Sequence, residues 1–157
     1  MIDVRYIAGL IDGEGCVTIH LRTQRSTVSV HGYSVQVSIA QKRPKVLRMI
    51  HARFGGHLAP PRKKCTVYIL TYTHRKAETI LRAVLPYLIV KRREAEIALE
   101  LRQLVKVGTY GSGWGGNITP KRTRRRMFTL WKELMSLPGR GKRLGKRSRE
   151  ILGRSIA

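Results

Sequence analysis

The chain begins with a helical pattern. Apolar residues recur at intervals of three and four between residues 7 and 11, and Asp3 stands where a helix N-cap is expected. We therefore predict a short helix with residues 4–12 as its interior. It should end at Gly13 or Gly15, because glycine readily adopts the positive φ of a helix terminus.

From residue 16 the apolar period changes from a helical one to two. Residues 16–24 alternate between apolar and polar side chains, and residues 33–40 repeat the alternation after a loop. This pattern is typical of strands with one buried and one exposed face, so the two segments predict an antiparallel hairpin pair. The polar positions on the exposed face are Thr18, His20, Arg22, Gln24, Ser34, Gln36 and Ser38.

A second helix is predicted after this pair of strands. Pro44 suits the first turn of a helix that runs to about Phe54, and Gly55–Gly56 can stop it. The buried side of this helix should consist of Val46, Leu47, Met49 and Ile50.

Another strand pair and more helices follow. Residues 57–59 and 65–73 predict strands on either side of a basic turn over 60–64. The buried face of the longer strand stays open, because Val67 and Ile69 compete with Tyr68, Leu70 and Tyr72. Helices are predicted over about 75–85, 92–107 and 119–137, the last with Met127, Phe128, Leu130, Trp131 and Leu134 as its apolar positions.

The order of elements indicates the fold class. Helix, two strands, helix, two strands and helix predict an α+β fold, αββαββα, with one antiparallel sheet covered on one side. We expect residues 1–107 to form the core of a single domain. Residues 108–157 would add a glycine-rich loop, a C-terminal helix and a basic tail packed on the same domain.

Length and charge narrow the class of protein. The 157 residues suit one domain, and no apolar run approaches the roughly 18 residues of a membrane span. Lys and Arg number 32 against 9 Asp and Glu, a formal net charge of +23. Such a surplus repels itself unless a polyanion neutralises it, which makes nucleic acid the expected partner.

The acidic residues are distributed unevenly. Residues 15–77 contain none, although they hold twelve Lys or Arg. Asp12 and Glu14 stand at the head of this segment. We interpret at least one of them as a carboxylate kept for chemistry; the alternative is ordinary charge at a helix end.

The segment Ile7-Ala8-Gly9-Leu10-Ile11-Asp12-Gly13-Glu14-Gly15 carries the clearest resemblance. It resembles the signature of the LAGLIDADG homing endonucleases, with Glu for the penultimate Asp and Gly for the preceding Ala, and the likeness extends over about residues 1–107. The resemblance implies the homing-endonuclease fold, with the sheet as a DNA-binding saddle. A single copy of the motif implies a homodimer, in which two such helices cross at Ala8, Gly9, Asp12 and Gly13.

The resemblance also implies a metal-dependent active site. Glu14 and the backbone carbonyl of Gly13 would bind Mg²⁺ (or Mn²⁺), a hard cation that prefers oxygen ligands. Asp12, on a different side of the helix, is given a structural or helix-capping role. Gln41, Lys91 and Lys45 match positions that orient water or stabilise charge at the cut phosphate, although Lys91 could also be one cation of a basic run.

Recognition of double-stranded DNA would divide between two groups of residues. The exposed sheet face and Arg62 would read bases, since Arg and Gln can form paired hydrogen bonds with guanine and adenine. Lys63, Lys64, Lys121, Arg122 and the basic tail would contact phosphates, which give affinity and register without sequence information.

Three functions remain open at this point. The first is a site-specific endonuclease that makes double-strand cuts in a long pseudo-palindromic site for intron homing. The second is a binding protein on the same fold: an inactive maturase with intron RNA as partner, or a DNA-binding regulator. The third, a ribosomal-type RNA-binding protein, explains the charge but not the motif. Glu14, Gln41 and Lys91 together favour the enzyme.

The N-terminus carries no secretory signal, because it has an early acid and lacks a positive head and a long apolar centre. We expect an intracellular protein that is not secreted. The resemblance favours a chloroplast, a mitochondrion or a prokaryotic or archaeal cytoplasm, and no membrane partner.

Overall fold

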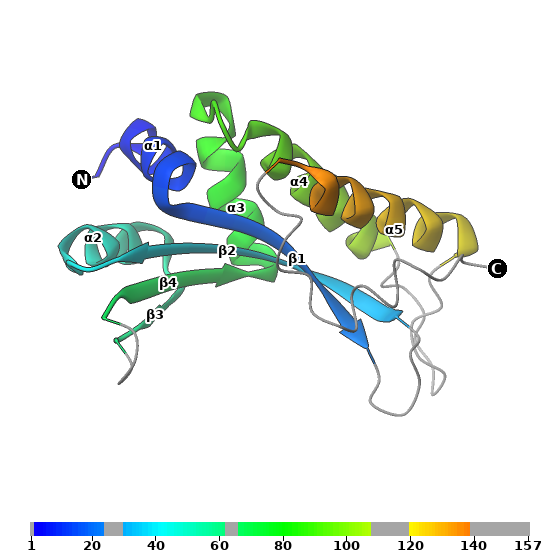
Figure 1. Ribbon diagram of the computed structural model, residues 1–157, viewed down its shortest axis with the longest axis horizontal. Helices are drawn as coiled ribbons and strands as arrows, with labels where there is room; N and C mark the ends of the chain where they lie inside the picture. The colour runs from blue at the N-terminus through cyan, green and yellow to red at the C-terminus, as the bar shows by residue number, and fades with distance from the viewer. Residues whose placement is uncertain (1, 24–29, 62–65, 108–119, 139–157) are drawn as a thin grey trace.

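The computed structural model describes residues 2–23, 30–61, 66–107 and 120–138 (Figure 1). Its sheet contains β1 (Gly15–Thr23), β2 (Val30–Gln41), β3 (His57–Ala59) and β4 (Tyr68–Thr73). Among the described residues these strands form one sheet in the order β1-β2-β4-β3, with every neighbouring pair antiparallel. The predicted order of helices and strands is confirmed.

The helices gather on one side of the sheet. They are α1 (Val4–Glu14), α2 (Lys45–Phe54), α3 (His74–Val84), α4 (Arg92–Val107) and α5 (Lys121–Ser136), with a 3₁₀ turn, η1 (Leu85–Tyr87), after α3. In Figure 1, α1, α3, α4 and α5 lie above the curved sheet, and no described helix crosses the lower face. No described helix combines the length and apolar character that crossing a membrane requires.

The boundaries of α1 follow from its two ends. The Asp3 carboxylate accepts a hydrogen bond from the backbone N–H of Arg5 at 2.8 Å, so the predicted N-cap is confirmed. The predicted positive φ at the C-terminus is wrong: Gly15 is extended, with φ −84° and ψ 163°. Glycine is required there by space instead, since a Cβ would lie 2.7 Å from the carbonyl oxygen of Ile11.

The second helix differs from its prediction at one side chain. Leu47 and Ile50 are buried and Val46 is half-buried, but Met49 is 44% exposed and is not part of the buried side. Leu47 and Ile50 are the buried residues of α2, which packs against β3 and β4. The predicted stop at Gly55–Gly56 is confirmed by φ values of +67° and +104°.

The open question about β4 is settled by its pairing with β2. Leu70 lies opposite Ile39 and Tyr72 opposite Val37, so both point into the covered core and are fully buried. Ile69 lies on the other face, opposite Ala40. The strand begins at Tyr68, three residues later than predicted.

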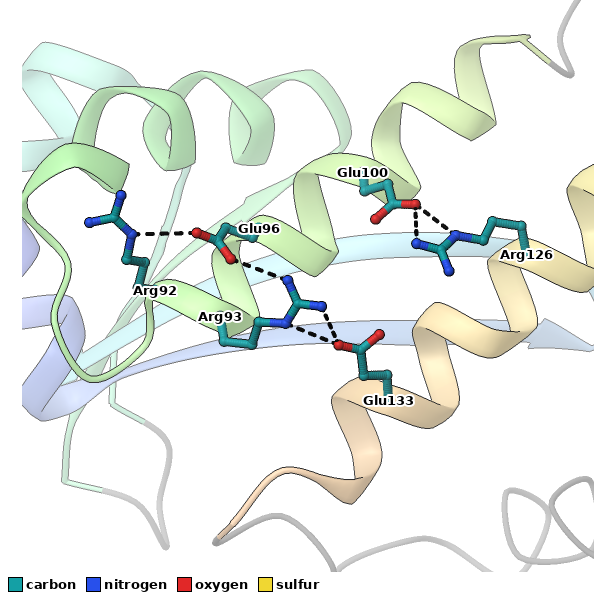
Figure 2. Close-up of polar contacts among 6 residues, drawn as sticks. All are labelled: Arg92, Arg93, Glu96, Glu100, Arg126 and Glu133. Atoms are coloured by element: carbon teal, nitrogen blue, oxygen red, sulfur yellow. Dashed lines mark hydrogen bonds and ion pairs between the residues drawn. The ribbon is translucent and has the colours of Figure 1, made fainter.

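The C-terminal helix joins the same core. The predicted apolar positions of α5 are confirmed as buried, and Trp131 stacks on Phe128 with ring centroids 5.6 Å apart. Figure 2 shows ion pairs that hold α5 against α4: Arg93 to Glu133 at 2.5 Å and Arg126 to Glu100 at 2.6 Å. Packing and charge therefore fix α5 over α4 and β1.

Candidate functional site

The uncovered face of the sheet is a polar, acid-free surface. The antiparallel register places Thr18 opposite Gln36, and His20 opposite Ser34. Residues directly opposite one another share a face, so these side chains stand in rows across the sheet. The prediction that Thr18, His20, Ser34, Gln36 and Ser38 share the exposed face is confirmed by this register and by the burial of the alternating Val17, Ile19, Val35, Val37 and Ile39.

The structure extends this surface onto β3 and β4, for which the sequence pattern had assigned no residues to the exposed face. Thr71 lies between Ser38 on β2 and His57 on β3, and Thr73 lies beside Gln36. These positions went unnoticed because the buried face of β4 was ambiguous from its apolar pattern alone. The burial of Tyr72 between two polar threonines decides it.

The other predicted DNA-binding residues lie on β1, on α5 or outside the described residues. Lys121 and Arg122 are exposed in the first turn of α5, and Arg22 continues the β1 register opposite Gly32. The remaining predicted contacts, together with the loop over 108–117 and the basic tail after 139, lie outside the described residues; the side chains concerned are Gln24, Arg62, Lys63 and Lys64.

The end of α1 presents one free carboxylate. Glu14 is the last residue of the helix and is exposed, and no described residue donates a hydrogen bond or forms an ion pair with its side chain. The next acidic residue along the chain is Glu78. Glu14 is therefore an exposed hard oxygen donor, with no hydrogen bond or ion pair to a described residue.

Asp12, two residues earlier, is fully engaged. Its Oδ2 accepts from the backbone N–H of Ile89 and its Oδ1 from the backbone N–H of Lys91, both at 2.8 Å. The Lys91 ammonium in turn donates to the backbone carbonyl of Asp12. The structure thus brings Lys91 to the end of α1 that carries Glu14, as the predicted active site requires.

Gln41 also comes to this end of the helix. Gly15 pairs with Ile39, and Gln41 ends β2 two residues further on, half-buried. One strand residue rises about 3.3 Å, so Gln41 lies within roughly 7 Å, along its strand, of the point where α1 enters β1. Lys45 is exposed at the start of α2, and its predicted role in the pocket stays a prediction.

The small-residue side of α1 is only partly free. Gly9 and Gly13 are exposed, as a close approach by a second helix would require. The inclusion of Ala8 in that surface is wrong, because Ala8 is fully buried in its own chain. Consecutive helical residues point about 100° apart, so Ala8 faces the core where Gly9 does not. The Asp12 carboxylate is likewise occupied within its own chain.

A family model described as LAGLIDADG endonuclease matches residues 7–106. The chain belongs to this family. The LAGLIDADG motif of residues 7–15 occupies most of α1 and its C-cap, so the motif contains both carboxylates described above. No match was found among curated proteins.

Solved structures show the LAGLIDADG fold over most of the chain. The archaeal intron-encoded homing endonuclease I-Vdi141I, solved with DNA, is 21% identical, with a TM-score of 0.73 over 95% of this chain and 92% of its own. I-CvuI, solved with its target and Ca, is 20% identical, with a TM-score of 0.57 and coverages of 81% and 93%. I-SmaMI, bound to cleaved DNA, is 14% identical, with a TM-score of 0.70; the match spans 97% of this chain and 48% of I-SmaMI.

Proposed function

We propose that this LAGLIDADG protein is a homing endonuclease that uses divalent metal ions to make double-strand cuts at a specific DNA site. The observation that carries the proposal is Glu14: an exposed carboxylate without a described partner, at the same helix end as Lys91. A protein that only binds nucleic acid gains nothing from an acid there, because the carboxylate repels phosphate.

The uncovered sheet face supports DNA as the substrate. Its rows of Ser, Thr, Gln and His offer hydrogen-bond donors and acceptors without a carboxylate. A polar sheet of this kind can meet base edges in the major groove, the groove with a distinct pattern for each base pair. The exposed cations of α5, beginning with Lys121 and Arg122, supply phosphate contacts.

A divalent metal fits the residues at the end of α1. Glu14 supplies a free carboxylate, and the last carbonyls of a helix, Gly13 among them, lack intrahelical partners. Among the described residues, no group of three or more His, Cys, Asp or Glu side chains is placed to hold a metal ion. This suits Mg²⁺ or Mn²⁺, since Mg²⁺ binds through one or two carboxylates, phosphate oxygens and waters. The ion would activate water and stabilise charge on the cut phosphate.

The chain's own residues have separate tasks in this proposal. Lys91 adds a positive charge beside Glu14, where negative charge develops on the phosphate during cleavage. Gln41 can both donate and accept a hydrogen bond, so it can orient a water at the end of β2. Each Asp12 carboxylate oxygen accepts a hydrogen bond from a backbone N–H group, so the proposal assigns the metal to Glu14 and a structural task to Asp12.

The active protein is proposed to be a homodimer. One chain provides one Glu14, whereas a double-strand cut needs two active sites. The match to about half of I-SmaMI supports two copies of this chain doing what one longer chain does. The exposed apolar residues Tyr6, Ile89 and Val90, with the bare backbone at Gly9 and Gly13, supply a surface beside α1 for the second copy.

The proposal is tested by cleavage of a DNA library that spans intron insertion sites, with Mg²⁺ and with EDTA. We expect double-strand cuts at one site, only with the metal. Glu14→Gln should slow cleavage by at least about 10³-fold, because a catalytic metal supplies several kcal/mol of transition-state stabilisation.

Glu96→Gln is the matched control, since Glu96 is an exposed acid that pairs with Arg92 and Arg93 on α4; it should cleave at the wild-type rate. Full activity of Glu14→Gln, or no metal-dependent cut by the wild type, would contradict the enzyme. Light scattering of the DNA complex should give the mass of two chains, and a complex with one chain would contradict the homodimer.

A further inference from the structure

The Asp12 carboxylate holds a distant part of its own chain. It accepts hydrogen bonds from the backbone N–H groups of Ile89 and Lys91, which are 77 and 79 residues further along the sequence. Charged acceptors form stronger hydrogen bonds than neutral ones, and both oxygens are used. The end of α1 is therefore tied directly to the segment before α4.

That segment has few other means of holding its position. Leu88 is buried, but the next two side chains are largely in solvent, with Ile89 87% and Val90 71% exposed. The backbone of the segment is extended at Leu88 and enters α4 at Arg92. The two bonds to Asp12 thus fix the backbone where packing within the same chain contributes little.

The same contact also sets the position of the Lys91 amine. The ammonium group donates to the Asp12 carbonyl, which lies in the last turn of α1, where helix carbonyls are unpaired and the helix dipole is negative. Lys91 is half-buried, so its amine is confined and does not extend freely into water. Backbone and side chain of Lys91 are both held by one residue.

We infer that Asp12 is the positioning residue for Lys91: it holds the amine at the end of α1 that carries Glu14, where the cleavage step needs a positive charge. The inference rests on the proposed function, because it assigns Asp12 a task in that reaction. The inference gives the two acids of the motif different roles. Glu14 acts on the substrate side, and Asp12 acts through Lys91.

Two convergent N–H donors explain why the residue is a carboxylate. Asparagine at position 12 would keep the size but offer one acceptor oxygen, and its amide N–H₂ would face an N–H donor. Asp12→Asn should therefore loosen the segment and displace the Lys91 amine. A misplacement of about 1 Å in a catalytic arrangement can reduce the rate about 10²-fold.

The test compares the cleavage rates of Asp12→Asn, Lys91→Met and the double variant. Each is measured at saturating enzyme on the intact DNA site that the wild type cuts. We expect Asp12→Asn to cut about 10²-fold more slowly in Mg²⁺, because a misplacement of about 1 Å in a catalytic arrangement reduces the rate by about that factor. DNA affinity measured in Ca²⁺ should stay near that of the wild type. The double variant should be no slower than Lys91→Met, because a positioning residue has no effect once its target is gone.

Asp3→Asn is the matched control. Asp3 lies at the other end of α1 and also accepts from a backbone N–H, and asparagine caps a helix equally well. It carries the same loss of charge and should cleave at the wild-type rate.

Three results would overturn the inference: a wild-type rate for Asp12→Asn, a loss explained by weaker DNA binding, or effects of Asp12→Asn and Lys91→Met that multiply. A wild-type rate for Lys91→Met would remove the role of Lys91 itself, and with it this part of the proposed function. Multiplying effects would leave the endonuclease intact and reject only the positioning.

Ile89→Pro tests the same contact from the other side if Asp12→Asn does not fold. It removes one of the two donors and leaves the carboxylate, and Leu88 already has the extended backbone that a residue before proline adopts, with φ −72° and ψ 136°. It should slow cleavage without adding to Lys91→Met. A wild-type rate for Ile89→Pro would contradict the inference.

Discussion

The carboxylates at the end of α1 and those between α3, α4 and α5 have opposite surroundings. Glu78, Glu96, Glu100 and Glu133 each pair with at least one arginine, and Figure 2 shows three of them between α4 and α5. Glu14 has no described partner, and Asp12 accepts only from backbone N–H groups. Among the described residues, arginines thus form ion pairs with these glutamates of the helix layer. Glu14, the acid proposed for catalysis, has no such partner.

The comparison predicts that one substitution, Glu to Gln, has different consequences in the two regions. In the helix layer it should change stability. At the end of α1 it should change activity alone.

Glu78→Gln should have the largest effect on stability. Glu78 lies between Arg82 at 3.2 Å and Arg102 at 3.7 Å, and the Arg102 side chain is only 8% exposed. Removing the carboxylate leaves a buried guanidinium uncompensated, a change that typically costs about 3–5 kcal/mol. Thermal or urea unfolding measures this loss, and an unchanged melting temperature would show that the buried pair contributes nothing.

Replacing both Lys121 and Arg122 by Ala should lower the affinity for DNA and make it less dependent on salt. Both are exposed at the start of α5, where they contact no described acid. Each lost phosphate contact lowers the slope of log affinity against log salt by about 1, so we expect about 2 per subunit. Titrations at several salt concentrations check this. Lys132→Ala, on the same helix with its ammonium over Phe128, is the control and should keep the slope.

Glu133→Gln should have a small, salt-dependent effect. The hydrogen bonds that Arg93 donates to Glu133, and then to Glu96, raise the pKa of Arg93, but its side chain is largely in solvent. Exposed ion pairs contribute little to stability, and salt screens them. Unfolding at low and high salt should show a deficit that shrinks as salt rises; a deficit that persists would mean that the pair is effectively buried.

Glu14→Gln should leave the free energy of unfolding of the free protein unchanged within about 0.5 kcal/mol, the usual range for surface substitutions away from structural contacts. The same substitution should slow cleavage by at least about 10³-fold, as stated above. A clear loss of stability would show that Glu14 has a structural partner after all, and the contrast between the two regions would fail.

Elements that depend on neighbouring residues could be predicted from the sequence. Helix α4 has the predicted bounds, Asp3 caps α1, and the alternation in β1 and β2 assigned both faces correctly. These features follow from local periods and from the chemistry of a few adjacent side chains. The motif also singled out Glu14 as the candidate metal ligand.

Features that depend on distant contacts could not be predicted. Whether Tyr72 or Thr71 faces the core was decided by the pairing of β4 with β2. The exposure of Met49 depends on how little of α2 the sheet edge covers. The tie from Asp12 to Ile89 and Lys91 joins residues 77 and 79 positions apart, and no local period encodes such a contact. The sequence by itself determined which residues could do chemistry; the tertiary structure decided which of them meet, because only packing brings separate segments to the same place.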